Sequence, residues 1–168
     1  MKNRSGEESQ YKKRLKAERY AYLLLKFRPR STKEVQDRLL RKGFEKELVR
    51  DVIESLTEKR LLSDKEFSRW WVKNRIIASP RGKKLLRLEL KIKGIADDEI
   101  DDVLKEVSPG EESDEFLAKE VALKKLKRAT IFSDDKVKVK RRLFAFLKRR
   151  GFSNDTVMRT IRELLDEK

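Results

Sequence analysis

Three glycines mark a pattern that occurs three times along the chain. Gly43, Gly94 and Gly151 are each followed by a bulky apolar residue, and a leucine stands four positions before each of them. Apolar residues also recur eight positions before each glycine and six, ten and thirteen positions after it. The aligned residues are Val35, Leu39, Phe44, Val49, Ile53 and Leu56, then Leu86, Leu90, Ile95, Ile100, Leu104 and Val107, then Leu143, Leu147, Phe152, Val157, Ile161 and Leu164. Self-similarity at a period of roughly fifty residues is typical of tandem supersecondary units, so we predict three repeats.

Each repeat is predicted to contain three helices. The apolar positions after each glycine are separated by three or four residues, the spacing that gives a helix one apolar face. Each glycine stands where a helix would end, and the cation before it (Lys42, Lys93 or Arg150) suits the helix dipole. Apolar and polar residues alternate over 86–92 as in a strand, but the repeat assigns 82–93 to a helix. We therefore predict an all-α chain, a tandem array of three three-helix repeats that is elongated and curved.

Breaks in the helical pattern set the expected boundaries. We expect a flexible leader at 1–10 and three-helix repeats at 11–60, 61–108 and 109–168. The first helix is expected to begin near Tyr11 and to end before Pro29, because proline cannot continue a helix. Capping boxes that begin at Ser31 and Ser63 start later helices. The third repeat differs from the others, because it has a longer connection around 131–134.

The chain carries an excess of positive charge and lacks two chemically versatile residue types. It has 45 Lys and Arg residues against 30 Asp and Glu residues, a formal net charge of +15, and neither Cys nor His. The charge favours an anionic partner, either nucleic acid or an acidic protein surface, although many of the charges also fit a solvated helical surface. The missing residues exclude disulfides, thiol chemistry and the commonest general base, and the sequence has no glycine-rich phosphate loop. We therefore expect a non-enzymatic, cytoplasmic protein without metal, cofactor or membrane segment.

Basic residues gather in three stretches that are candidates for contact with an anionic partner. Residues 69–93 hold nine basic residues against Glu89 alone, whereas residues 97–106 are mainly acidic. Two further basic stretches lie at 124–128 and 136–150. The candidate contact residues are Arg30, Lys73, Arg75, Arg81, Lys83, Lys84, Arg87, Lys91, Lys124, Lys125, Lys127, Arg128, Arg141, Arg142, Lys148 and Arg149. Neutralisation of the basic helix by the acidic segment is the alternative interpretation of this charge pattern.

Some candidates have an alternative structural role. Arg30 and Arg81 hold equivalent positions after a proline, where each could reach phosphate or cap the carbonyl groups of the preceding helix. Trp70 could stack on a base or anchor an interface, but we prefer the interpretation that it fills the core beside Phe67. Trp71 has an aromatic counterpart in the first repeat and is predicted to be a core residue.

Three segments of the chain resemble the bacterial RecX family of recombination regulators. They are Ser-x-x-Glu-Val-x-x-x-Leu-x-x-Lys-Gly-Phe at 31–44, Leu-Leu-Ser-Asp-x-x-Phe-x-x-Trp-Trp-Val-x-x-Arg at 61–75 and Leu-x-Leu-Glu-Leu-x-x-Lys-Gly-Ile at 86–95. The resemblance extends over nearly the whole chain from about Arg14 and is weakest at the lengthened connection of the third repeat. It implies an all-helical array of three three-helix repeats. Dimerisation is left open, but array proteins of this kind can work as monomers, and we expect a monomer.

The resemblance also implies a partner. A protein of this family would bind the RecA filament on single-stranded DNA, lie along its helical groove and modulate RecA, usually suppressing its ATPase, strand exchange and coprotease functions. Binding to double-stranded DNA is left open, as are the sign of the modulation and the division of the basic clusters between DNA and RecA. The rival is a basic helix-turn-helix DNA-binding protein that acts without RecA, because residues 35–56 have the crude form of that motif. The final helix of each repeat is acidic or mixed, which fits a major groove poorly.

Overall fold

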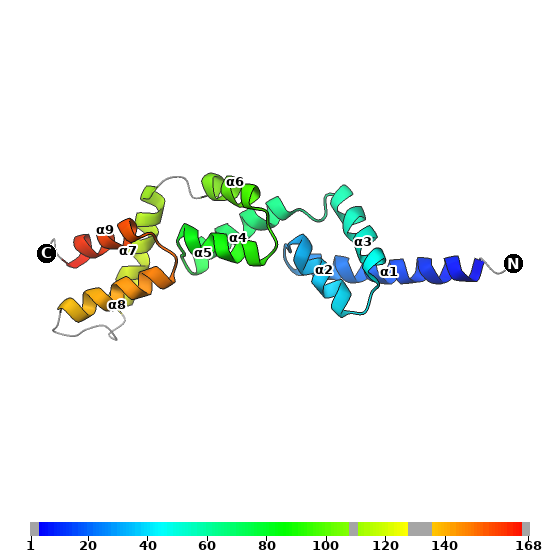
Figure 1. Cartoon of the computed structure of the whole chain (residues 1–168), viewed down its shortest axis with the longest axis horizontal. Coiled ribbons are helices and arrows are strands. Elements are labelled where there is room, and N and C mark those ends of the chain that lie inside the picture. The colour runs from blue at the N-terminus through cyan, green and yellow to red at the C-terminus, as the bar shows by residue number, and fades with distance from the viewer. Residues whose placement is uncertain (1–3, 108–110, 128–135, 166–168) are drawn as a thin grey trace. The chain divides into compact units, whose positions relative to one another are not determined.

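The computed structural model describes residues 4–107, 111–127 and 136–165 of the chain. Within these ranges the chain forms nine helices and no strand, in the order labelled in Figure 1. The helices are α1 (Arg4–Phe27), α2 (Thr32–Arg41), α3 (Lys46–Glu58), α4 (Asp64–Ala78), α5 (Lys83–Ile92), α6 (Asp97–Val107), α7 (Glu111–Lys127), α8 (Lys136–Arg149) and α9 (Asn154–Leu165). The predicted all-α class and three successive groups of three helices are confirmed. None of the described helices is both long enough and apolar enough to cross a membrane.

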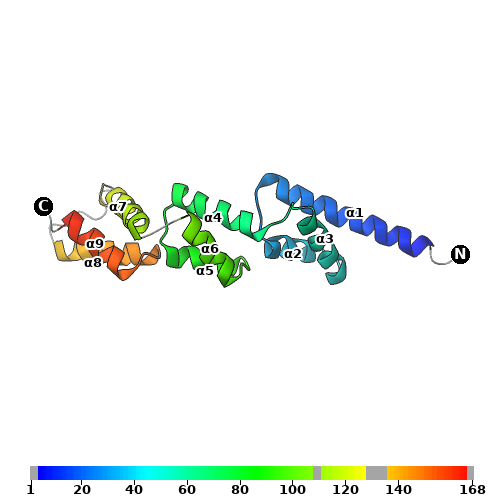
Figure 2. The same cartoon turned by 90° about the horizontal axis from the view of Figure 1, so that it is seen from above.

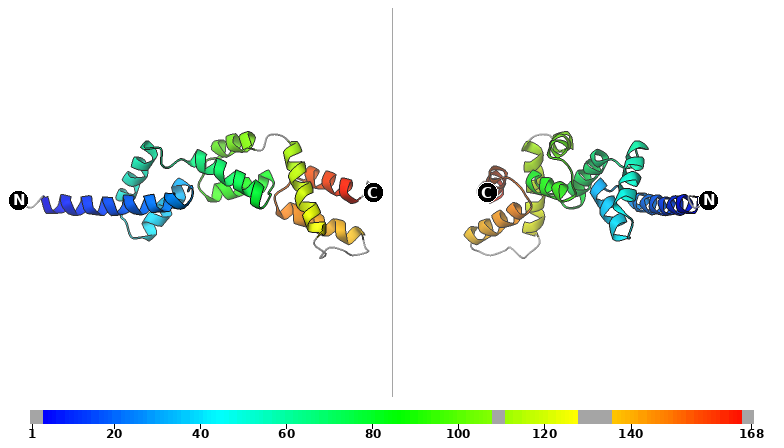
Figure 3. Two further views of the ribbon diagram at one scale, coloured as in Figure 1. Left: turned by 180° about the vertical axis from the view of Figure 1, so that it is seen from behind. Right: turned by 45° about the vertical axis from the view of Figure 1, so that its right-hand side comes forward.

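The helices form two compact units. The first holds the described residues up to Trp70 together with Lys93–Ile95, and the second holds Trp71–Ile92 with the described residues from Ala96 onward. In the first unit, α1, α2 and α3 enclose Ala17, Ala21, Val35, Leu39, Val49, Val52, Leu56 and Leu62. In the second unit, α7, α8 and α9 enclose Leu117, Ala118, Val121, Ala122, Leu143, Leu147, Phe152, Val157 and Ile161. Figures 2 and 3 show α8 and α9 side by side, with α7 packed against them.

Three helices end at the glycines that define the repeat. Gly43, Gly94 and Gly151 have φ angles of 91°, 84° and 84°, in the left-handed region that favours glycine. After α2, the amide of Gly43 donates to Leu40 O at 2.9 Å and the amide of Phe44 donates to Leu39 O at 3.3 Å. This pair of bonds is a Schellman motif, and equivalent bonds follow α8. The prediction that a glycine at this position ends a helix is therefore confirmed.

The strand-like alternation near Gly94 belongs to a helix, as the repeat predicted. Within α5, Leu86 and Leu90 are buried, whereas Leu88 and Ile92 are 54% and 62% exposed. Only the residues four positions apart face the core, because helical geometry places those two on one side. Two leucine or isoleucine side chains of this helix therefore remain on the surface.

The first helix is longer than its polar start suggested. It begins at Arg4, although we expected it to begin near Tyr11 and residues 1–10 to form a leader. Residues 1–3 lie outside the described residues, and 4–10 are the first turns of α1. An ion pair of 2.6 Å between Glu8 and Lys12, one turn apart, supports this part of the helix. A serine and a glycine in the first turn do not prevent helix formation, because that turn has few intrahelical bonds to lose.

Candidate functional site

The carboxylate of Glu89, on α5, contacts three donor side chains from α4 and the turn that follows it. Glu89 accepts hydrogen bonds from Trp71 Nε1 at 2.8 Å and Arg75 Nε at 3.0 Å, and it forms an ion pair with Arg81. The guanidinium of Arg75 also lies over the Trp71 ring, 4.3 Å from its centroid. Two guanidinium groups share this one carboxylate, so the group retains positive charge. Trp71 was predicted to be a core residue, but it is only half-buried, with its indole N–H bonded to this carboxylate.

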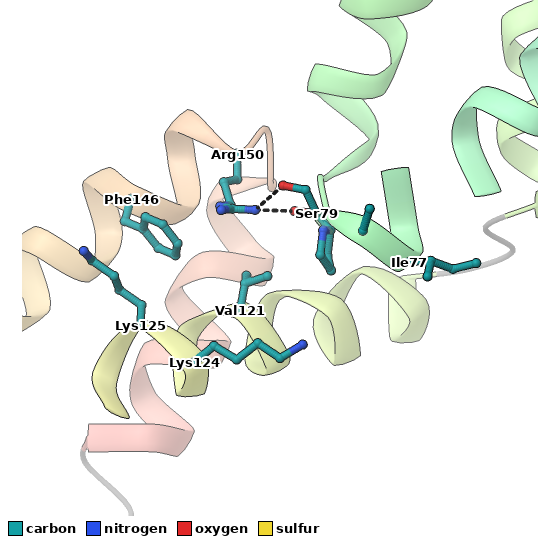
Figure 4. A pocket seen from close by; sticks show the side chains of 9 residues that line it. Ile77, Ser79, Val121, Lys124, Lys125, Phe146 and Arg150 are labelled. Atoms are coloured by element: carbon teal, nitrogen blue, oxygen red, sulfur yellow. Dashed lines mark hydrogen bonds between the residues drawn. The ribbon is translucent and has the colours of Figure 1, made fainter. Parts of the chain in front are cut away.

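A third arginine reaches the same turn from the end of α8. Arg150 Nη1 donates to Ser79 Oγ and to Pro80 O, both at 3.1 Å. The backbone carbonyl of Arg150 accepts a hydrogen bond from the amide of Gly82 at 2.9 Å. Arg150, in the C-terminal cap of α8, thus binds the turn between α4 and α5 through both its side chain (Figure 4) and its backbone carbonyl.

The closeness of these arginines affects the pKa of Arg81. Burial, together with the positive charges of Arg75 and Arg150, lowers the pKa of Arg81 below its ordinary value. Arg150 was predicted to be a helix-end cation and was not among the candidate contact residues. Arg150 stands directly before its repeat's glycine, the position that Lys93 holds in the second repeat, and Lys93 also forms contacts beyond its own helix.

Two basic candidates on α5 are paired with the acidic helix α6. Arg87 forms ion pairs with Asp97, at 3.6 Å, and with Asp101, and Lys91 pairs with Asp97 at 2.8 Å. The hydrogen bond from Lys91 lowers the pKa of the Asp97 carboxyl below its ordinary value. Neutralisation, the alternative interpretation of the charge pattern, is therefore what the structure shows for these two cations. Among the described residues, no group of three or more acidic side chains is placed to hold a metal ion.

Arg30 and Arg81, which hold equivalent positions after a proline, make different contacts. Arg30 Nε donates to Leu24 O at 3.0 Å and so caps the C-terminus of α1. Burial and the nearby Arg28 lower the pKa of Arg30. Arg81 instead pairs with Glu89. For Arg30, capping is therefore the observed role, and the sequence pattern alone could not separate the two.

The remaining basic candidates differ in how freely they are exposed. Lys148 Nζ donates to Phe152 O at 3.3 Å beyond the end of α8, and Lys124 pairs with Glu120 at 2.8 Å. Lys125 lies 5.7 Å from the centroid of the Phe146 ring and is half-buried. The exposed candidates are Lys73, Lys84, Lys127, Arg141, Arg142 and Arg149. Lys83 is half-buried near the start of α5, and Arg128 lies outside the described residues.

The indole of Trp70 is half-buried in the first unit. Its ring lies 6.2 Å from that of Phe67, tilted by 39°, and the guanidinium of Arg28 lies 5.8 Å from its centroid. The position beside Phe67 agrees with the interpretation that we preferred from the sequence. The partial exposure and the cation contact leave one part of the indole at the surface.

The chain matches known proteins along its whole repeated part. Models of the first, second and third RecX three-helix domains match residues 17–56, 63–104 and 113–161. A protein named Regulatory protein RecX from Mycobacterium sp. (strain JLS) is 32% identical over 84% of this chain and 78% of its own length. A protein of the same name from Corynebacterium efficiens is 32% identical over 99% of this chain and 78% of its own length.

Solved structures have the same fold. The crystal structure of RecX from Lactobacillus salivarius has a TM-score of 0.78 and 25% identity, over 94% of this chain and 99% of that one. A second structure, of a regulatory protein RecX, has a TM-score of 0.82 over the whole of this chain and 80% of that chain. Because three domain models in the family's order match most of the residues, this chain belongs to the RecX family of regulatory proteins.

Proposed function

We propose that this protein binds the RecA filament assembled on single-stranded DNA and lowers its ATPase, strand exchange and coprotease activities, acting as a monomer. The observation that carries the proposal is the match of all three repeats to the RecX domains, in order. The repeats, expected at 11–60, 61–108 and 109–168, would each contribute contacts to the filament. A tandem array suits this role because it distributes weak contacts over several similar units.

Electrostatics support an anionic partner for the second unit. The exposed cations Lys84, Arg142 and Arg149 have no acidic partner in the described part of the chain, whereas Arg87 and Lys91 are neutralised by α6. The Glu89 group adds two guanidinium groups around one carboxylate. Cations of this kind give rapid, salt-dependent attraction to a phosphate backbone.

The test is the ATPase rate of RecA on single-stranded DNA, with this protein titrated at two salt concentrations. Its affinity for the same DNA without RecA is measured in parallel. We expect ATPase to fall at substoichiometric amounts of this protein, where binding to bare DNA is too weak to compete for the strand. Inhibition that only follows occupation of the DNA, or specific binding to duplex DNA without RecA, would replace the proposal with the basic DNA-binding alternative.

Charge reversal at exposed, unpaired cations should weaken filament binding without unfolding the protein. In the triple variant Lys84→Glu, Arg142→Glu and Arg149→Glu, each replaced side chain is exposed, and none of the three forms an ion pair with another described residue. We expect the concentration for half-maximal inhibition to rise at least about tenfold at 0.1 M salt, since each lost phosphate contact costs roughly fivefold there. Circular dichroism should show unchanged helicity.

The control makes the same charge change elsewhere. Lys46, Lys65 and Lys105 are exposed lysines outside the proposed contact set, and their replacement by glutamate removes the same net charge. An equal loss of inhibition in both triple variants would mean that net charge, not these positions, determines binding. If the first triple variant inhibits RecA as strongly as wild type does, Lys84, Arg142 and Arg149 do not belong to the contact surface.

A further inference from the structure

The outer face of α1, which carries Tyr11, Leu15 and Tyr22, is apolar and lies at the surface. These three side chains are 64%, 47% and 39% exposed, whereas Ala17 and Ala21 of the same helix are fully buried in the core of the first unit. Leu15 and Tyr22 line a shallow groove of about 360 Å³. Figures 1 and 2 show the N-terminal half of α1 extending beyond α2 and α3. The described residues of the first unit therefore leave the outer face to solvent.

The spacing along the outer face is that of a helix-packing seam. Residues 11, 15, 18 and 22 are separated by four, three and four positions, the heptad spacing with which one helix packs along another. Glu18, the polar member of this series, pairs with Arg14 at 3.2 Å. A helix that packs only on its own core needs one apolar face. A second apolar face, left on the surface, indicates an interaction site.

A row of cations runs beside the seam. Lys12, Arg19 and Lys26 are exposed and stand seven residues apart, each at the heptad position called e, next to the seam. Charges at this position form ion pairs with a partner helix. Lys12 pairs with Glu8 at the surface, at 2.6 Å, but Arg19 and Lys26 have no acidic partner in the described part of the chain. Carboxylates from another protein would complete this row.

We propose that the outer face of α1 binds an acidic amphipathic helix of a protein partner. The apolar side of that helix packs on Tyr11, Leu15 and Tyr22, and its carboxylates face the row of cations. The inference deepens the proposed function, on which it rests for the identity of the partner, because it places the acidic helix on the surface of RecA. Recognition of one amphipathic helix through anchors three, four and seven residues apart is a recurrent way of binding proteins.

Charge favours this occupant over a second copy of the chain. Residues 11–27 contain six basic residues and one acidic residue, so a second α1 would place cations against cations. Single-stranded DNA would match the cations, but a phosphate backbone would not cover the aliphatic side chain of Leu15. A lipid surface takes up a helix by one broad apolar face, whereas the outer face here is a narrow stripe, and another side of α1 is packed on the core.

The first experiment measures the affinity of the full chain for RecA without DNA, by isothermal titration calorimetry. The variant Tyr11→Ala/Leu15→Ala removes part of the apolar seam, and alanine preserves the helix. We expect Kd to rise about 30-fold or more, the effect of losing a single interface hot spot. The control Phe116→Ala/Met158→Ala truncates side chains of α7 and α9 that are 66% and 52% exposed, and should change Kd less than about threefold. Circular dichroism should show unchanged helicity in both variants.

The second experiment tests the charge preference with a probe that does not depend on RecA. The probe is a peptide of repeated heptads with leucine at the seam and glutamate at the flanking positions, and its counterpart carries lysine in place of glutamate. We expect wild type to bind the glutamate peptide at least about tenfold more tightly, and Arg19→Glu/Lys26→Glu to reverse that preference. The control Lys46→Glu/Lys105→Glu makes the same charge change at exposed positions on α3 and α6 and should keep the preference.

The outcomes separate this inference from the proposed function. If wild type inhibits RecA ATPase and Tyr11→Ala/Leu15→Ala binds RecA as tightly as wild type does, the inference fails and the proposed function stands. If wild type neither binds nor inhibits RecA, the proposed function fails and the peptides decide the inference. Binding of the glutamate peptide that is lost in Tyr11→Ala/Leu15→Ala then supports the inference, whereas equal binding of both peptides, or of neither, overturns it.

Three further measurements identify the other occupants of the outer face. Binding to oligothymidylate, binding to phosphatidylserine vesicles and self-association in analytical ultracentrifugation are each compared between wild type and Tyr11→Ala/Leu15→Ala. A loss in one of these assays, with unchanged binding to RecA and to the glutamate peptide, would assign the outer face to DNA, to a lipid surface or to a second copy of the chain. Each of these results would overturn the inference.

Discussion

Replacing Gly151 with alanine should destabilise the second unit by roughly 3–4 kcal/mol, the sum of a backbone cost and a steric cost. The φ angle of 84° alone costs an alanine about 1–2 kcal/mol. The new Cβ would also lie 2.5 Å from the backbone nitrogen of Leu85 and closer still to its Cβ. Neither atom can move away by side-chain rotation, so α5 and the end of α8 must separate. Urea unfolding followed by circular dichroism measures the loss.

Two matched substitutions separate the two costs. Gly43 has the same left-handed backbone, with φ of 91°, but an added Cβ meets nothing within 4 Å, so Gly43→Ala should cost only about 1–2 kcal/mol. At Gly82 an added Cβ would lie 2.5 Å from the carbonyl carbon of Gly151, so Gly82→Ala tests a second contact between the same two segments. Equal losses for Gly43→Ala and Gly151→Ala would show that the packing of Gly151 on Leu85 does not form in solution.

The repeat explains why the helices and their ends could be predicted from the sequence. Aligned apolar positions decided that 82–93 is helical where alternation alone suggested a strand, and α5 occupies most of that segment. The glycine positions identified the left-handed caps, because few other residues adopt that backbone. Ser31 was predicted to start a helix, and its Oγ accepts from the amide of Glu34 at 3.2 Å. These features depend on residues that are close together in the sequence, so the spacing of residue types is enough to predict them.

The contacts between distant segments could not be predicted in the same way. Ser31 Oγ also donates to Lys93 O at 2.8 Å, and the amide of Gly82 donates to Arg150 O at 2.9 Å. Residues 31 and 82 both stand twelve positions before their repeat's glycine, and both bond to the residue just before a later one. Such a contact depends on how helices pack, which a single sequence does not contain. The same limit applies to the basic residues, because spacing gave no means to separate Arg87, neutralised by α6, from the exposed Lys84.

The Arg28–Glu34–Lys93 group should make the stability of the first unit depend on pH. Glu34 accepts hydrogen bonds from Arg28 at 3.0 Å and 3.2 Å and also pairs with Lys93, and all three side chains are less than one third exposed. Burial alone would raise the pKa of the Glu34 carboxyl, but the hydrogen bonds and charges of Arg28 and Lys93 lower it below its ordinary value. Glu34→Gln leaves two cations without their carboxylate, so we expect a loss of about 3 kcal/mol at pH 7.

The loss should disappear in acid, and its direction follows from the lowered pKa. A carboxyl with a lower pKa in the folded protein stabilises the fold fully above its unfolded pKa of about 4.3, and the contribution fades as the pH falls through the folded value. Urea unfolding of wild type and variant at pH 7 and at successively lower pH should therefore give curves that converge. Glu8→Gln, in the exposed pair with Lys12, is the control and should change little at any pH, because solvent screens such pairs. A gap for Glu34→Gln that stays constant into strong acid would assign the loss to packing, since a protonated glutamate differs little from glutamine in charge.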